Sequence, residues 1–369
     1  MNQLFGWKQP GLFLLALAAG ILPFAVPEVC AAALREGLAL CSGPLLLSLF
    51  PFLVVSRLLI QCPESDLLAL PFRLAAWGIG IRTPCAARVL CIGFLGGFAP
   101  AASAAAQAVR TGQLTAEEAD ALLPACICSG PSFVVLTVGQ SLLGSAELGV
   151  LLFASQITAN YLTAALLNRF AGVRSVKSGS AAPASPAPPR LDEILADAAI
   201  TYCKLCGFIL FFRLLAAGAG ALLPAGAGTL CAILLEVCSG CDLASRTGRW
   251  GSLLCCAALS VQGLSVLLQV RTICPPEMTL RPLYRARMLH LPLSLALFYL
   301  LLPGGDADVF STLPARVLLM RRVPPDCALL VFAVCCMAAC TLRSGIRQVE
   351  QKQMARNAGG CCINSKTLL

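Results

Sequence analysis

The sequence predicts an all-α protein that crosses a membrane several times. Of its 369 residues, 58% are apolar and only 12% are charged, whereas about a quarter of the residues of an ordinary soluble domain carry a charge. The mean hydropathy of +0.82 indicates more apolar surface than a soluble fold of this length buries. We therefore expect about eight to ten membrane segments of ~20 residues, including broken and re-entrant helices.

Six windows are long and apolar enough to enter a bilayer. They span residues 11–26, 37–60, 146–170, 194–223, 286–303 and 326–342. The first window is expected to be a membrane helix and not a signal peptide, because no small-residue cleavage site follows it before Pro27. Two further hydrophobic regions, 85–143 and 230–270, are interrupted by Gly, Pro, Ser and charged residues. Residues 67–78 are expected at the membrane interface.

A proline-rich stretch divides the chain into two halves. Residues 175–190 read SVKSGSAAPASPAPPR, which is typical of an extended, solvated linker. Basic residues around this linker and in the C-terminal tail indicate the cytoplasmic side. The predicted division is an N-terminal membrane helix (1–36), a first repeat (37–170), a linker (171–192), a second repeat (193–303), a C-terminal membrane helix region (304–343) and a basic cytoplasmic tail (344–369).

Three pairs of short strings recur in the same order in the two halves. A helix ending in Arg-Leu-Leu is followed by Arg-Thr-Gly and then by a polar break. The Arg-Thr-Gly strings lie in 108–113 and 244–249, and the polar breaks are SGPS at 129–132 and QGLS at 262–265. Paired, interrupted hydrophobic segments are typical of inverted-repeat transporters, whose binding sites they form.

The first interrupted region has two breaks. Gly96, Gly97 and Pro100 interrupt one helix, and Ser129–Pro131 interrupts the next. Lipid offers no partner to the backbone groups that such breaks expose, so protein, water or a ligand must bind them. This pattern favours a polar pocket for a small solute. The alternative is a pair of kinks that neighbouring helices relieve.

Two local patterns predict hydrogen bonds. Thr115 is a suitable N-cap, since Glu117 and Glu118 follow it in the first turn of a helix. Gln156 and Asn160 are four residues apart and so share one helix face. For these two amides we expect hydrogen bonds between helices in preference to ligand contacts.

Glu236 is the clearest candidate for a functional charge. It follows an apolar run directly, and an ionisable group within a membrane is costly unless it has a partner or a function. It is expected to bind a cation, take up a proton or accept hydrogen bonds from a hydroxylated solute. The alternative is a glutamate at the membrane edge, because Asp242 and Arg246 follow closely.

The remaining motifs argue against an enzyme. The pairs Cys203/Cys206 and Cys238/Cys241 resemble half-sites for zinc, but the first lies in an apolar helix, and we expect no metal and no cofactor. His290 is the only histidine, so multi-histidine sites are excluded. With Arg287, it is expected at a helix entrance, in contact with lipid headgroups. No phosphate-binding loop, nucleophile elbow or dinucleotide motif is present, and we expect no catalytic residues. The net charge of +9 is dispersed singly between apolar runs, which indicates topology and not nucleic-acid binding.

Several of these stretches resemble the nucleoside-recognition (Gate) domain family of bacterial membrane proteins. The similar stretches are 97–100, GQLTAEEA at 112–119, SGP at 129–131, 236–240, QGLS at 262–265 and 285–290. The resemblance covers about residues 37–303. Two positions depart from the family pattern: the run 98–103 lacks a basic residue, and Gly130 replaces an asparagine.

The resemblance implies two Gate-like repeats around one solute site. This domain is similar to the core of concentrative nucleoside transporters, whose site lies between two re-entrant hairpins and two unwound helices. The implied partners are the lipid bilayer, a small polar solute such as a nucleoside, and a coupling cation. The candidate substrate-binding residues are Gly97, Pro100, Ser103, Ser129, Gly130, Pro131, Ser132, Glu236, Ser239, Gln262, Gly263 and Ser265.

Within this family the chain is most similar to the sporulation integral membrane proteins of spore-forming bacteria. That likeness implies a multi-pass protein of the bacterial inner membrane that transports or senses a small polar metabolite while the spore cortex forms. Alternating access would then arise from rocking of one repeat against the other. A second hypothesis is a membrane scaffold that recruits cortex-assembly proteins without transport. A third, an intramembrane enzyme, lacks an identifiable base.

Overall fold

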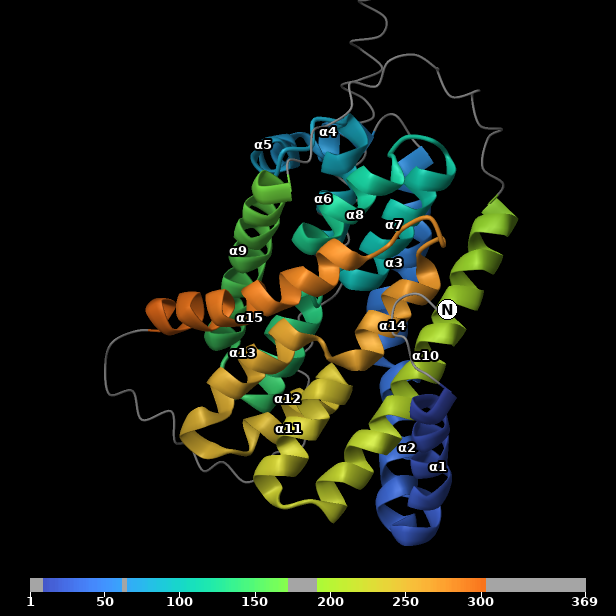
Figure 1. The fold of residues 1–369 in the computed structure, drawn as a ribbon, viewed down its shortest axis with the longest axis vertical. Coiled ribbons are helices and arrows are strands. Elements are labelled where there is room, and N and C mark those ends of the chain that lie inside the picture. Colours follow the sequence, from blue (N-terminus) through green and yellow to red (C-terminus); the bar gives the residue numbers. More distant parts are fainter. Residues whose placement is uncertain (1–8, 62–64, 172–190, 303–369) are drawn as a thin grey trace, which may run out of the picture.

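The structure, a computed structural model, describes residues 9–61, 65–171 and 191–302. Within these ranges the chain is helical and has no strand (Figure 1), which confirms the predicted all-α fold class. The apolar window 326–342, the basic tail and the proline-rich stretch 175–190 lie outside the described residues.

The described helices fall on either side of the linker. The first half contains α1 (Gln9–Ala25), α2 (Pro27–Ser42), α3 (Pro44–Gln61), α4 (Ser65–Leu68), α5 (Leu70–Gly78), α6 (Pro84–Gly96), α7 (Phe98–Arg110), α8 (Ala116–Cys126), the π-helix η1 (Ser132–Leu142) and α9 (Ala146–Ala171). The second half contains α10 (Leu191–Leu222), α11 (Ala225–Leu235), α12 (Val237–Ser245), the short 3-10 helix η2 (Gly248–Trp250), α13 (Gly251–Val261), α14 (Gly263–Ile273) and α15 (Arg281–Leu301).

Three units in the described part of the chain are long and apolar enough to cross a membrane. They are α9, α10 and the span Gly248–Ile273, and the pair α1 and α2, bent by 109°, could add a fourth. These helices support a membrane protein by length and composition. The number of eight to ten segments stays a prediction.

The apolar window 37–60 is not one continuous helix. The helix α2 ends at Ser42, Gly43 has non-helical angles (φ −112°, ψ −103°), and α3 begins at Pro44. A proline is favoured at a helix start because it lacks the N–H that an interior position requires. The window therefore contains the end of one helix and all of the next.

The two interruptions in the first half differ in kind. The helices α6 and α7 pack against each other, so that a Cβ added to Gly93 would lie 3.2 Å from Cβ of Ala101. They form a helical hairpin with its tip at Gly97. By contrast, α8 and η1 are not packed side by side. They form one helix broken over residues 127–131.

The second half repeats this order. The helices α11 and α12 form a second hairpin, whose arms approach so closely that a Cβ on Gly240 would lie 2.8 Å from Cα of Ile233. The tip of this hairpin is Glu236. The helices α13 and α14 then form a second broken helix, interrupted at Gln262, which adopts the left-handed conformation (φ 64°).

The Arg-Thr-Gly strings occupy corresponding places, each after the second arm of a hairpin. The hydroxyl of Thr111 donates to the carbonyl of Gln107 at 2.9 Å, and that of Thr247 donates to the carbonyl of Ala244 at 2.7 Å. The glycine that follows each threonine has a positive φ, +70° and +63°. Glycine is favoured there because a left-handed residue at a helix end costs least without a side chain.

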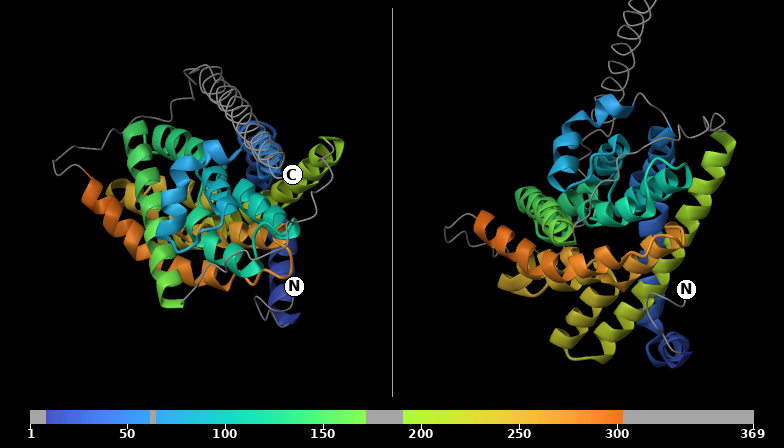
Figure 2. Two further views of the ribbon diagram at one scale, coloured as in Figure 1. Left: turned by 90° about the horizontal axis from the view of Figure 1, so that it is seen from above. Right: turned by 45° about the horizontal axis from the view of Figure 1, so that its top comes forward.

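Long helices border both pairs of broken elements. Figure 2 shows α10 alongside α2 and α3, and α15 packed across α9. The predicted N-cap at Thr115 is confirmed: its hydroxyl accepts from N of Glu118 at 3.1 Å, and the Glu118 carboxylate accepts from N of Thr115 at the same distance. This capping box stabilises the start of α8 at Ala116.

Candidate functional site

Each hairpin tip touches the break of the broken helix that follows it. Gly97, with φ +81°, lies against Gly130, and an added Cβ would come within 2.7 Å of N of Gly130. In the second half, Gly263, with φ +69°, lies against Glu236, and an added Cβ would come within 2.9 Å of N of Glu236. Both contacts require glycine, because of the backbone angle and because of the space.

The first pair and Glu236 of the second pair lie around one cavity. Its lining includes Gly96 and Phe98 from the first tip, Gly130 and its neighbours from the first break, Glu236 from the second tip and Gln269 from α14. Its volume is about 50 Å³, enough for a few water molecules, whereas pockets for small organic ligands measure roughly 300–1,000 Å³. The cavity as it stands is therefore too small for such a ligand.

Four of the twelve candidate residues line this cavity. Ser129, Gly130, Ser132 and Glu236 line it, and Ser103 lines a second cavity. The others lie at the tips and breaks or within one turn of them: Gly97, Pro100, Pro131, Ser239, Gln262, Gly263 and Ser265.

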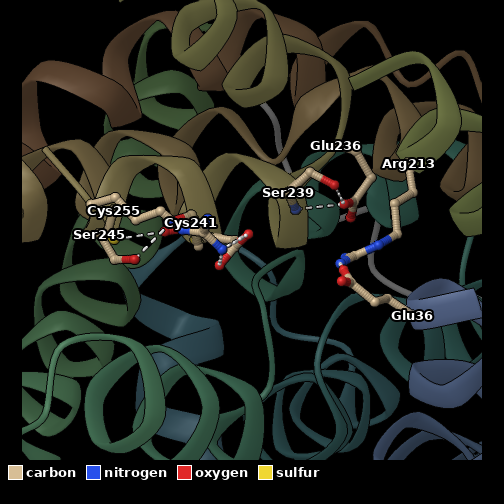
Figure 3. A network of polar contacts seen from close by, with 9 residues as sticks. Glu36, Arg213, Glu236, Ser239, Cys241, Ser245 and Cys255 are labelled. Atoms are coloured by element: carbon tan, nitrogen blue, oxygen red, sulfur yellow. Dashed lines mark hydrogen bonds and ion pairs between the residues drawn. The ribbon is translucent and has the colours of Figure 1, made fainter. Parts of the chain in front are cut away.

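Glu236 is the N-cap of α12. Its carboxylate accepts hydrogen bonds from N of Cys238 (2.8 Å), N of Ser239 (2.7 Å) and Oγ of Ser239 (2.9 Å), as Figure 3 shows for Ser239. The residue is 2% exposed, so an exposed position at the membrane edge is excluded. Charge near the first turn of a helix stabilises the helix. Part of the hydrogen-bonding capacity of this carboxylate is thus already used within the protein.

Arg213 of α10 lies near this tip (Figure 3). Its Nη2 donates to Oε2 of Glu36 at 2.7 Å, and its guanidinium attracts the Glu236 carboxylate electrostatically. An ion pair thus links α10 to α2 beside the second tip.

Two buried amides of the second broken helix each lack one hydrogen bond. The Nε2 of Gln269 donates to Oγ of Ser265 at 2.9 Å, but the Oε1 atoms of Gln269 and Gln262 have no partner among the described residues. Both residues are 1% exposed. Because a buried acceptor without a donor costs about 1–3 kcal/mol, these oxygens favour a site that accommodates water or a donor group of a solute.

The expectation that Arg287 and His290 contact lipid headgroups is wrong. Arg287 is 8% and His290 1% exposed. The guanidinium of Arg287 donates to the carbonyl of Ile127, at the break of α8, and to that of Ser260 at 3.3 Å, near the break of α13. These carbonyls lie at the negative ends of two half-helices. No signal in the sequence separates Arg287 from Arg281 and Arg285, which precede it on α15.

The amides of α9 behave differently from each other. Gln156 donates to Oγ of Ser260 at 2.9 Å and to the carbonyl of Cys256 at 3.2 Å, so the prediction of hydrogen bonds between helices is confirmed for this residue. Asn160, 1% exposed, has no hydrogen-bond partner in the described part of the chain.

Cysteines do not gather into a metal site. Across the described ranges, no group of three or more His, Cys, Asp or Glu side chains is arranged to hold a metal ion. Cys241 and Cys255 are neighbours (Figure 3), with Sγ of Cys255 donating to the carbonyl of Cys241 at 3.5 Å.

Comparisons with known proteins add no assignment. No protein-family model, no curated protein and no solved structure matches the chain. The argument for function therefore depends on the geometry of the two tip–break pairs.

Proposed function

We propose that the protein binds a small polar solute in the cavity between the two tip–break pairs. The observation that carries this proposal is that both hairpin tips, the first helix break and α14 line one cavity. Most of its lining is apolar, but Ser129, Ser132 and the Glu236 carboxylate supply polar groups. Broken helices leave backbone groups that a solute can bind where lipid cannot.

We further propose that residues 37–170 and 193–303 are two Gate-like repeats of inverted topology. The support is the shared order of long helix, hairpin, Arg-Thr-Gly turn, broken helix and long helix. Because the cavity volume is only about 50 Å³, binding of a solute such as a nucleoside would require the tips to move away from the breaks. Rocking of one repeat against the other would open the site to alternate sides of the bacterial inner membrane.

The coupling cation implied by the family resemblance is replaced in this proposal by Arg287. In broken-helix transporters, carbonyls at the ends of half-helices bind the coupling cation. Here, the carbonyls of Ile127 and Ser260 accept from the Arg287 guanidinium. A tethered positive charge thus occupies the position that a free cation would take.

The biological setting is proposed from the resemblance to sporulation membrane proteins alone. We place the protein in the inner membrane of the sporulating cell, where it moves or senses a metabolite during cortex formation. Deletion of its gene would then reduce the yield of heat-resistant spores, and a variant without solute binding would not restore that yield. The alternative is a scaffold for cortex-assembly proteins, for which site variants would restore it.

The experiment that tests solute binding is thermal unfolding of the purified full-length protein in detergent against nucleosides, bases, amino sugars and cations. A solute at 100 times its Kd stabilises the folded state by about 2.7 kcal/mol, a shift of several degrees. We expect the shift in wild type and in Glu28→Gln, whose side chain is exposed, and its loss in Glu236→Gln. A panel without any stabilising solute, measured on folded protein, would favour the scaffold.

A further inference from the structure

A second cavity lies beside the first, among α3, α7, α10 and α14. Its volume is about 160 Å³, roughly three times that of the first cavity. Gln269 of α14 lines both cavities, so it forms part of the wall between them. Ser103, the candidate residue that is absent from the first cavity, lines this one. The second cavity therefore adjoins the proposed solute site.

The lining of this second cavity is strongly basic. Three cations, Arg57, Arg110 and Lys204, face a single carboxylate, Asp197. Nη1 of Arg57 donates to Oδ2 of Asp197, so that carboxylate is already neutralised. Arg110 and Lys204 have no carboxylate partner in the part of the chain that the structure describes, and both are exposed.

One buried donor in the lining of this cavity also lacks a partner among the described residues. Arg57 is 9% exposed, and its Nε atom has no hydrogen-bond acceptor among the described residues. Ser103 is 3% exposed and has a hydroxyl that can donate. A buried donor without an acceptor costs about 1–3 kcal/mol, so an acceptor entering the cavity would recover that free energy.

We propose that the second cavity binds the anionic group, a phosphate or a carboxylate, of the solute that enters the first cavity. An arginine fork and a lysine are the side chains that proteins use to bind phosphate and carboxylate. Arg110 and Lys204, which have no carboxylate partner, would attract an anion to the exposed side of the cavity. Arg57 would then bind the anion on the buried side. The inference depends on the proposed function, because it names the chemical class of the solute for that site.

The test uses inorganic phosphate as the probe and the full-length protein in lipid-free detergent. We expect phosphate to raise the Tm of wild type, and the double variant Arg110→Gln/Lys204→Gln to bind phosphate about tenfold more weakly or worse. Both side chains are exposed, so the variant is expected to fold. The matched control, Arg281→Gln/Arg285→Gln, removes the same charge from two other exposed positions and should bind phosphate as wild type does.

Four results would overturn the inference. The first is that phosphate does not stabilise the wild type. The second is that phosphate stabilises wild type and Arg110→Gln/Lys204→Gln equally, and the third is that the control variant binds phosphate as weakly as Arg110→Gln/Lys204→Gln, which would indicate a general charge effect. The fourth would indicate a lipid site. In that case phosphate has no effect on the Tm in detergent, while nanodiscs that contain phosphatidylglycerol stabilise the protein and nanodiscs of phosphatidylcholine alone do not.

The proposed function and the inference fail separately in this design. If a neutral solute stabilises wild type and Arg110→Gln/Lys204→Gln equally but not Glu236→Gln, the solute site stands and the anion inference is overturned. If phosphate binding depends on Arg110 and Lys204 while no panel solute depends on Glu236, the anion site is supported and the proposed function is not.

Discussion

The two tip–break pairs have the same geometry but different chemistry. In the first pair, Gly97 meets Gly130, and the contact is made by backbone alone. In the second pair, Gly263 meets Glu236, a carboxylate that caps α12, beside the left-handed Gln262. One pair therefore contributes close packing and exposed backbone groups, while the other contributes charge and side-chain acceptors.

This difference separates two requirements of the site. The first pair sets how tightly the cavity closes, because nothing larger than hydrogen fits at Gly97. The second pair sets which groups a solute would meet, because its carboxylate and amide oxygens lie at or near the cavity. The predictions below test this division, beginning with the largest expected effect.

The largest effect is expected at Gly97. Gly97→Ala should lower the free energy of unfolding by about 2–4 kcal/mol, since it adds the backbone strain of an alanine at φ +81°, ψ −163° to a clash with the backbone of Gly130. The control is Gly112→Ala, which has a similar φ of +70° but no heavy atom near the added methyl group and should cost about 1–2 kcal/mol. Equal losses of Tm in the two variants would contradict the close tip–break contact.

The second effect concerns the residue that connects both breaks. Arg287→Met should destabilise the protein by about 2–3 kcal/mol, because it leaves the carbonyls of Ile127 and Ser260 without their donor. Arg287→Gln should gain stability from added monovalent cations, which would take the place of the lost charge. Thermal unfolding in salts of differing cations checks both results. Arg285→Gln is the control at an exposed position; the same response there, or no cation response in Arg287→Gln, would count against the tethered cation.

A smaller effect is expected at the second tip. Ser239→Ala removes one of the three hydrogen bonds to the Glu236 carboxylate and should cost about 0.5–1.5 kcal/mol. Glu236→Gln weakens the cap itself and should cost about 0.5–2 kcal/mol. Solute-induced stabilisation should survive in Ser239→Ala and be lost in Glu236→Gln. If the solute stabilises both variants as much as wild type, the second tip does not contact the solute.

The smallest effect tests whether the two halves are equivalent outside the tips. Thr111→Val and Thr247→Val each remove a hydroxyl that bonds to the preceding helical turn, at a cost of about 0.5–1.5 kcal/mol. The losses should be similar, with Thr111→Val the larger because its hydroxyl also accepts from Gln113. Urea unfolding of both variants gives the comparison, and a large loss in only one half would weaken the case for a repeat.

Some of the helix breaks, but not how each is used, could be predicted from the sequence. Gly and Pro interrupt the apolar pattern at Gly97 and Ser129–Pro131, and Glu236 places a charge directly after an apolar run. Whether a break makes a hairpin or an interrupted helix depends on tertiary packing, such as that of Gly93 on Ala101. The same limit explains the missed break at Gly43, where the hydropathy stays high on both sides.

Contacts distant in sequence were the other part that could not be predicted. Arg57 pairs with Asp197 across 140 positions, and Arg287 reaches Ile127 across 160. No local pattern connects such residues. Arg287 was interpreted as interfacial because Arg281 and Arg285 precede it on α15, and these two are indeed exposed. Only the three-dimensional structure separates the buried arginine from its neighbours.

Hydrogen–deuterium exchange with and without the most stabilising solute tests the central claim most directly. If both tip–break pairs form one site, the solute should slow exchange in all four segments, 93–101, 127–134, 233–240 and 260–267, while residues 65–78 remain unchanged. Protection confined to one pair, or located outside these segments, would contradict a shared site between the two halves.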